Sequence, residues 1–237
     1  MRSAGWSCLL LLASACASPG DAQVLRLLSD SRQVSILTAL ACGPGDDLQR
    51  TPSAAFAPFE TSLSSDLTGC TPRSEVQATA RQASAFFADS IDIDTDAYAE
   101  VYETQAVTAF ARSDASILFR LEAGDWYAYS LDVQGTIGTM YGMATLSFSL
   151  ALQGPRGGAV ESMRAQSPAD RQRTWVEVGF LHRGILHAGE YRLDAHTTAD
   201  GHPNWSSSGE LRVRFKVRAL RTAVESATWE HVKLLYR

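Results

Sequence analysis

Residues 92–103 have the residue types and the spacing of a calcium-binding loop. Asp92, Asp94, Asp96 and Glu103 stand at positions one, three, five and twelve of an EF-hand loop. Position six of that loop is a glycine that permits a sharp turn, but here it is Ala97, and no convincing helix flanks the segment. Two interpretations therefore stay open: a calcium site, in EF-hand or another geometry, and a strand whose outer face carries the three aspartates.

Five aromatic residues could stack on sugar rings. They are Trp126, Tyr127, Tyr129, Trp175 and Trp205. Stacking requires that they lie on an exposed sheet face, whereas most aromatic side chains in strands belong to the core. Trp126 has the parity opposite to the apolar residues around it, which favours its exposure. These residues predict a carbohydrate-binding module as one candidate function.

No motif predicts a catalytic residue. The five histidines, at positions 182, 187, 196, 202 and 231, do not form a zinc-ligand spacing with a cysteine or an acid. The chain lacks a Gly-x-Ser-x-Gly elbow, so a serine hydrolase would lack its best-known signature. The two carboxylates of a glycosidase are related in space rather than in sequence, and no Asp or Glu stands out for that role.

The N-terminus has the anatomy of a secretory signal peptide. Arg2 precedes an apolar run over residues 8–13, and residues 13–15 read Ala-Ser-Ala, an Ala-x-Ala cleavage pattern. The stretch Leu12-Ala-Ser-Ala-Cys16 resembles a bacterial lipobox, with Ala13 where leucine is usual. Residues 1–22 are therefore expected to be a signal peptide and tether. Lipidation of Cys16 would anchor the protein to a membrane; ordinary cleavage after Ala15, Ala17 or Ala22 is the alternative.

An exported chain would keep Cys42 and Cys70 in an oxidising compartment. We predict a disulfide between them, since they form an even pair there. It would close a loop of about 28 residues and contribute roughly 3 kcal/mol in the chain-entropy picture. The alternative is two unpaired buried thiols.

Alternating apolar residues predict strands that would position these side chains. Residues 115–135 are expected to form a hairpin around a turn at 122–125, where Gly124 can take a positive φ. Residues 74–113 predict two or three strands, and 145–152 and 210–219 one each. In Gly184–Leu193, Tyr191 is expected to hydrogen-bond nearby backbone at a sandwich corner. Pro58 predicts an edge strand or the start of a strand.

Short alternating strands with few helix signals predict an all-β fold. We expect an antiparallel, jelly-roll-like β-sandwich over residues 23–220, with a tail over 221–237. Trp229, Val232, Leu235 and Tyr236 fall at helical spacing and predict a short C-terminal helix. That segment is similar to a Thr-Trp-Gly-x-Val-Lys-x-Leu-Tyr-Arg tail of some exported bacterial proteins, with Glu230 where glycine is usual. It is expected to pack on the sandwich end or to act as a recognition tail.

Four stretches occur in the order found in a known group of proteins. They are Ser31-Arg-Gln-Val-Ser35, Phe56-Ala-Pro-Phe59, Leu131-Asp-Val-Gln-Gly135 and Leu186-His-Ala-Gly-Glu-Tyr-Arg-Leu193. Through them, residues 24–219 resemble uncharacterised exported bacterial β-sandwich proteins, many of which end in a PEP-CTERM sorting tail. The Pro-Glu-Pro signal, membrane helix and basic cluster of that tail do not occur here. The resemblance implies a fold and export, but no activity.

The net charge bears on the partners of the protein. The formal net charge is −5, which argues against nucleic acid as a partner. We expect a non-catalytic protein of the periplasm, the cell envelope or the extracellular space, with a structural or surface-interaction role and no cofactor. The alternative is a carbohydrate-binding module, with calcium as a stabilising ion, and an enzyme comes third. The expected partners are a polysaccharide or another envelope protein.

Overall fold

The computed structural model describes residues 24–40, 47–68, 75–102, 107–154, 157–167 and 173–220. The signal peptide and tether, Cys16, the Cys42–Cys70 disulfide, Glu103 and the C-terminal helix were all predicted in residues outside these ranges. Within them every regular element is a strand, so the all-β prediction is confirmed. The described residues contain no helix of the length and apolarity needed to cross a membrane.

Ten strands form one antiparallel sheet. In chain order they are β1 (Leu25–Leu40), β2 (Asp47–Pro52), β3 (Phe59–Thr68), β4 (Glu75–Phe86), β5 (Ser90–Tyr102), β6 (Val107–Met140), β7 (Met143–Leu152), β8 (Ala159–Gln166), β9 (Arg173–Gly201) and β10 (Trp205–Leu220). Residues 74–113 contain β4, β5 and the start of β6, as predicted, and β3 begins directly after Pro58.

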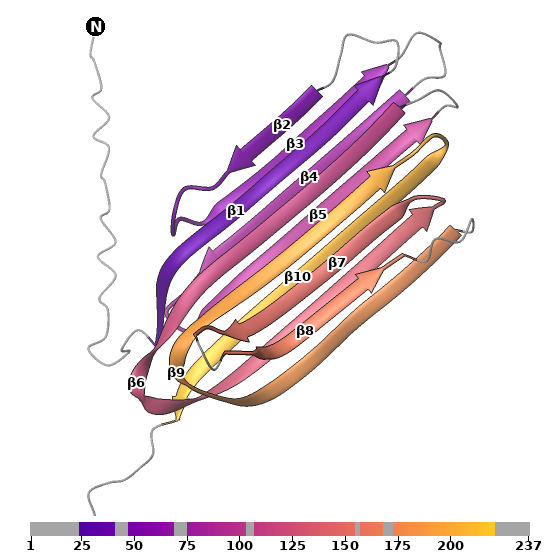
Figure 1. Ribbon diagram of the computed structural model, residues 1–237. Helices are drawn as coiled ribbons and strands as arrows, with labels where there is room; N and C mark the ends of the chain where they lie inside the picture. Colours follow the sequence, from indigo (N-terminus) through magenta and orange to yellow (C-terminus); the bar gives the residue numbers. More distant parts are fainter. Residues whose placement is uncertain are drawn as a thin grey trace, which may run out of the picture.

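The predicted hairpin at residues 115–135 is wrong. Those residues belong to one strand, β6, which pairs with β9 on both sides of residues 122–125. The register shifts there, since Leu121 lies opposite Gly189 and Trp126 lies opposite His187. Figure 1 shows β6 and β9 turning together at the lower left. The glycine-containing segment therefore lies at an irregularity in a long bent ribbon, and each strand continues beyond it.

The bend folds the sheet into two layers. We call layer A the strands β2, β1, residues 107–121 of β6, residues 189–201 of β9, β7 and β8, in that order. Layer B contains β3, β4, β5, β10, residues 126–140 of β6 and residues 173–187 of β9. The sandwich is thus made by two strands that each contribute to both layers (Figure 1).

Alternation along each strand fills the space between the layers. On β10, Leu211, Val213, Phe215 and Val217 are buried while the intervening Arg and Lys residues are exposed, as the period of two predicts. The buried apolar residues form two clusters, and in one of them the ring of Phe119 lies 5.8 Å from that of Tyr191 and 5.3 Å from that of Phe215. The Tyr191 hydroxyl donates to the His187 carbonyl at 2.9 Å, which confirms the predicted tyrosine at the corner.

Arg32 is buried between the layers. Its Nε donates to Oδ2 of Asp30 at 2.7 Å, and neither side chain of the pair has exposed surface. Its two terminal nitrogens donate to Ser84 Oγ at 2.9 Å and to the carbonyl of Ala57 at 2.7 Å. The guanidinium also lies over the Phe86 ring, 4.6 Å from the centroid. One cation therefore connects β1, β4 and the segment that leads into β3.

Candidate functional site

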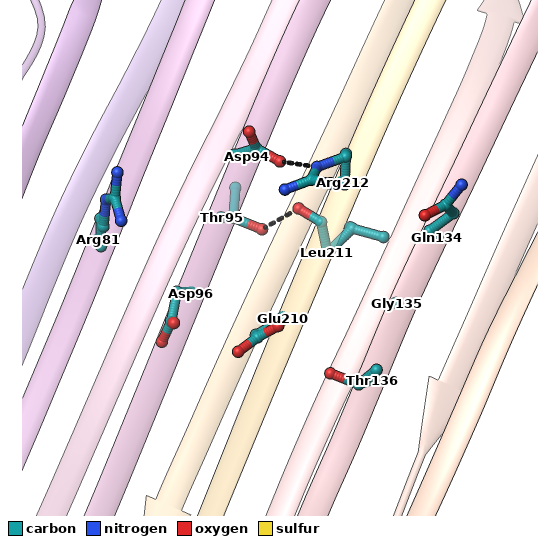
Figure 2. Close-up of a pocket in the computed structure, with 10 residues that line it drawn as sticks. All are labelled: Arg81, Asp94, Thr95, Asp96, Gln134, Gly135, Thr136, Glu210, Leu211 and Arg212. Carbon is teal, nitrogen blue, oxygen red and sulfur yellow. Dashed lines mark hydrogen bonds and ion pairs between the residues drawn. The ribbon is translucent and has the colours of Figure 1, made fainter.

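The outer face of layer B carries a polar groove of about 340 Å³. Strands β4, β5, β10 and β6 cross it side by side, and Figure 2 shows its side chains. We call it the layer-B groove. Its lining residues are Arg81, Asp94, Thr95, Asp96, Gln134, Gly135, Thr136, Glu210, Leu211 and Arg212.

Sheet register brings these residues together from distant parts of the sequence. One row across the strands runs from Arg81 through Asp96 and Glu210 to Thr136. The neighbouring row runs from Asp94 through Arg212 to Gln134. Alternate side chains of a strand share one face, so both rows point outward from the same side of the sheet.

The carboxylates of the groove differ in their surroundings. Asp94 accepts a hydrogen bond from Nε of Arg212 at 2.7 Å, so its charge is balanced. Asp96 lies opposite Glu210 in the register. Burial, and to a lesser degree the charge of Glu210, raise the pKa of Asp96, and Arg81 offsets only part of this rise. Two acids directly opposite each other destabilise a sheet, so Asp96 and Glu210 reduce the stability of the fold.

We expect Asp96→Asn to stabilise the protein at pH 7 by less than about 1 kcal/mol, since solvent screens part of the repulsion. A raised pKa means that the folded state disfavours the ionised form, and this cost is present only when the carboxyl is ionised. The gain should therefore shrink as the pH falls toward 4 and vanish below about pH 3, where aspartate is protonated in both states. Urea denaturation of both proteins at pH 7 and below about pH 3 tests this, and an equal gain at both would contradict it.

Trp175 adjoins the groove. Its side chain is 65% exposed, and in the register it lies opposite Gly138, two residues beyond Thr136. A Cβ atom at position 138 would come within 2.7 Å of the Trp175 ring, so the ring lies over Gly138 and would have to move if a larger residue stood there. Trp175 therefore leans from β9 toward β10, over the strand that contributes Gln134 and Thr136 to the groove.

The other predicted aromatic residues do not join Trp175. Tyr127 and Tyr129 cannot stack on a ligand, because both are buried on the inner face. Trp126 is exposed, as predicted, and its ring centroid lies 3.8 Å from that of His187. It stands at the bend, about 40 Å along β6 from Gly138 at the usual rise of a strand. Trp205 begins β10, where it packs edge-on against His202.

Tyr129 has a polar partner of its own inside the sandwich. Its hydroxyl donates to Oε1 of Glu161 at 3.2 Å, and His182 Nδ1 lies 2.5 Å from the same oxygen. Burial, together with the charge of Glu161 and the hydrogen bond to it, raises the pKa of Tyr129 to about 12. These contacts join β6, β8 and β9 and give Tyr129 a structural role.

The EF-hand interpretation of residues 92–103 is wrong. Residues 92–102 are extended in β5, where Asp92, Asp94 and Asp96 share its outer face. An EF-hand loop turns sharply around its ion, which this straight strand does not do. No group of three or more His, Cys, Asp or Glu side chains that could hold a metal occurs in the part of the chain that the structure describes. Calcium binding in another geometry stays a prediction.

Arg81, Gln134, Thr136, Glu210 and Arg212 were not predicted as site residues. The alternation of 210–219 indicated that Glu210 and Arg212 face solvent, but it carried no information on which strands flank them. Gly138, which lies opposite Trp175 in the register, is the signal that could have singled out this tryptophan. It is a residue without a side chain in an otherwise β-favouring stretch.

No family model and no curated protein matches this sequence. Among solved structures, the enzymatically active domain of bacteriophage CBA120 tailspike protein 4 is 11% identical, with 68% of this chain and 19% of that chain covered and a TM-score of 0.19. TmCBM61 in complex with β-1,4-galactotriose is 10% identical, with 67% and 88% covered and a TM-score of 0.18.

The family 11 carbohydrate-binding module from Clostridium thermocellum, in complex with a β-1,3-1,4-mixed-linked tetrasaccharide, is 11% identical. The match covers 80% of this chain and 96% of that chain, with a TM-score of 0.18. This chain spans about one-fifth of the length of the tailspike domain. TM-scores this low do not show a common fold, so the functional conclusion depends on the groove itself.

Proposed function

We propose that the protein is a non-catalytic binding module that takes a polysaccharide on the layer-B groove. The observation that carries the proposal is Trp175, which is largely exposed beside a row of polar side chains. An exposed tryptophan on a sheet face presents a flat apolar surface with no role in the core. The apolar face of a sugar ring has the size and chemistry to cover it.

The polar side chains of the groove supply the complementary chemistry. Asp96 and Glu210 can accept hydrogen bonds from sugar hydroxyls, while Arg81 and Gln134 can donate to their oxygens. A chain of sugar units could therefore cross the strands from Trp175 along the groove. The repulsion between Asp96 and Glu210 fits this role, since a functional site retains features that cost stability.

The groove favours binding over catalysis. It lies on the open outer face of layer B, and a glycosidase gains much of its rate by enclosing and distorting its substrate away from water. Asp94 forms an ion pair with Arg212, so its charge is already balanced and it is a poor candidate for a catalytic carboxylate.

The proposal includes export to the cell envelope, supported by the apolar run at 8–13, the Ala-x-Ala pattern and Cys16. A chain found only in the cytosolic fraction of its cells would contradict export.

A glycan array with the full chain tests the binding proposal. We expect selective binding that Trp175→Ala weakens by about tenfold or more, which corresponds to the loss of one stacking contact with its apolar area. Trp126→Ala is the matched control, because it removes another exposed tryptophan far from the groove. Binding of no glycan, or equal losses from the two variants, would refute the proposal.

A further inference from the structure

Residues 173–187 of β9 form one edge of layer B. They pair with residues 126–140 of β6 on one side, and no strand in the described part of the chain pairs with the other side. The edge strands elsewhere are shorter: β2 has 6 residues, β8 has 8, and β3 has 10. An unpaired edge strand is a template for another chain, and this one is the longest in the described ranges.

This edge carries the charged residues Glu177 and Arg183 on its outer face, but it lacks other common protection against pairing. Its outer face exposes Trp175, Leu181 and Ile185 by 65%, 61% and 57%. Neither proline nor lysine occurs between residues 173 and 187, although these residues commonly block edge strands. By contrast, β3 begins after Pro58, and the charged residues on its outer face are acids only, Glu60 and Asp66. The β9 edge is therefore suited to pairing with a strand of another chain.

We propose that a second copy of this chain covers it, by antiparallel pairing of the two β9 edges about a two-fold axis at Phe180. Under this pairing, Glu177 lies opposite Arg183 of the second copy, and Arg183 lies opposite its Glu177. Both residues are exposed, and neither has an ion-pair partner among the described residues. A two-fold interface requires such self-complementarity, in which each contact occurs twice.

The apolar residues match in the same register. Trp175 lies opposite Ile185 of the second copy, so neither apolar residue faces a charged group across the two edges. Leu181 lies opposite Gly179, which leaves room for the larger side chain. All these residues have odd numbers and stay on the outer face. A two-fold axis moved by one residue to Leu181 would instead place Glu177 opposite Ile185 and Arg183 opposite Gly179.

This dimer does not compete with the layer-B groove. The Trp175 ring leans over Gly138, away from the β9 edge, so edge pairing leaves its outward surface free. The two B layers would join into one continuous sheet that carries both grooves on the same side. The inference depends on the edge alone and stands or falls separately from polysaccharide binding.

Sedimentation equilibrium over a range of concentrations tests the dimer with a charge exchange. The wild-type chain is expected to be a dimer, and Glu177→Arg or Arg183→Glu should weaken it by about tenfold or more, because each creates two like-charge pairs. The double variant restores both attractive pairs and should recover dimerisation. Arg50→Glu, an exposed change on the β2 edge, is the matched control and should leave the dimer unchanged.

Three results would overturn the proposal. A wild-type chain that stays monomeric at every concentration has no self-complementary edge, and its β9 edge is then free or taken by another protein. Single variants that dimerise as well as the wild type would place the interface elsewhere. Open-ended assemblies would show that pairing does not close about a two-fold axis. Circular dichroism of each variant establishes that the exchanged charges leave the fold intact, and glycan binding by the monomeric variants separates this inference from the proposed function.

Discussion

Asp30→Ala is expected to lower the free energy of unfolding by about 3–5 kcal/mol, because it leaves a buried cation without its partner. The Arg32 guanidinium has no exposed surface, and its Nε and one terminal nitrogen contact the same Asp30 oxygen at 2.7 and 2.5 Å. The remaining partners of Arg32 are neutral: two carbonyls and the Ser84 hydroxyl. They can accept its hydrogen bonds, but they do not balance its charge.

Urea denaturation of the wild type and three variants measures this cost. Asp30→Ala and Arg32→Met should each destabilise strongly, and the double variant should lose less than the sum of the two, since it buries no unpaired charge. Glu60→Ala is the matched control: it breaks the Glu60–Arg81 pair, which is exposed on both sides, and pairs of that kind contribute little. A loss below about 1 kcal/mol for Asp30→Ala would show that water or a structural shift compensates the charge.

The sequence predicted the faces of the strands because a strand has a period of two. The strand predicted at 210–219 is β10, and its alternation places Val213 in the core and Arg212 outside it. The exposure of Trp126 followed from the same rule. Arg32 was not predicted to be buried. In the sequence, an arginine near an aspartate has the same pattern whether the pair is buried or solvated, and only the structure shows that β4 and the segment before β3 enclose it.

Connections over long distances in the sequence could not be predicted. A glycine between two alternating runs predicts a hairpin, and an irregularity within one bent strand leaves the same pattern at 122–125. The two cases differ in the partner strand. In the structure that partner is β9, which follows more than thirty residues after the end of β6, and nothing local to Gly124 specifies it.

The candidate site was predicted in part for the same reason. Asp94 and Asp96 were predicted only as calcium ligands, and their neighbours Glu210 and Arg212 come from the other end of the chain. Trp175 was identified as one of five aromatic residues, and only the structure shows that it stands over Gly138 beside the groove. Composition indicates the chemistry that is available, whereas register determines which groups share a site.

Phe119→Ala is expected to cost about 3–5 kcal/mol of stability, because it opens a cavity that the surrounding aromatic rings cannot fill. Phe119 is fully buried in β6, two residues before the register shift at Leu121. Its ring contacts Tyr191 on the neighbouring β9 within layer A and Phe215 on β10 in layer B. It therefore bridges the two layers close to the bend.

The control for this substitution is Phe87→Ala, which removes the same atoms from a side chain that is 53% exposed and should change stability by no more than about 0.5 kcal/mol. In urea denaturation the slope of the transition distinguishes two consequences. An unchanged slope with a lower midpoint means that the sandwich still unfolds as one unit around a cavity. A lower slope means that the layers have separated at the bend, because less surface is then left to expose. A loss comparable to that of Phe87→Ala would contradict the role of Phe119 as the residue that ties the two layers together.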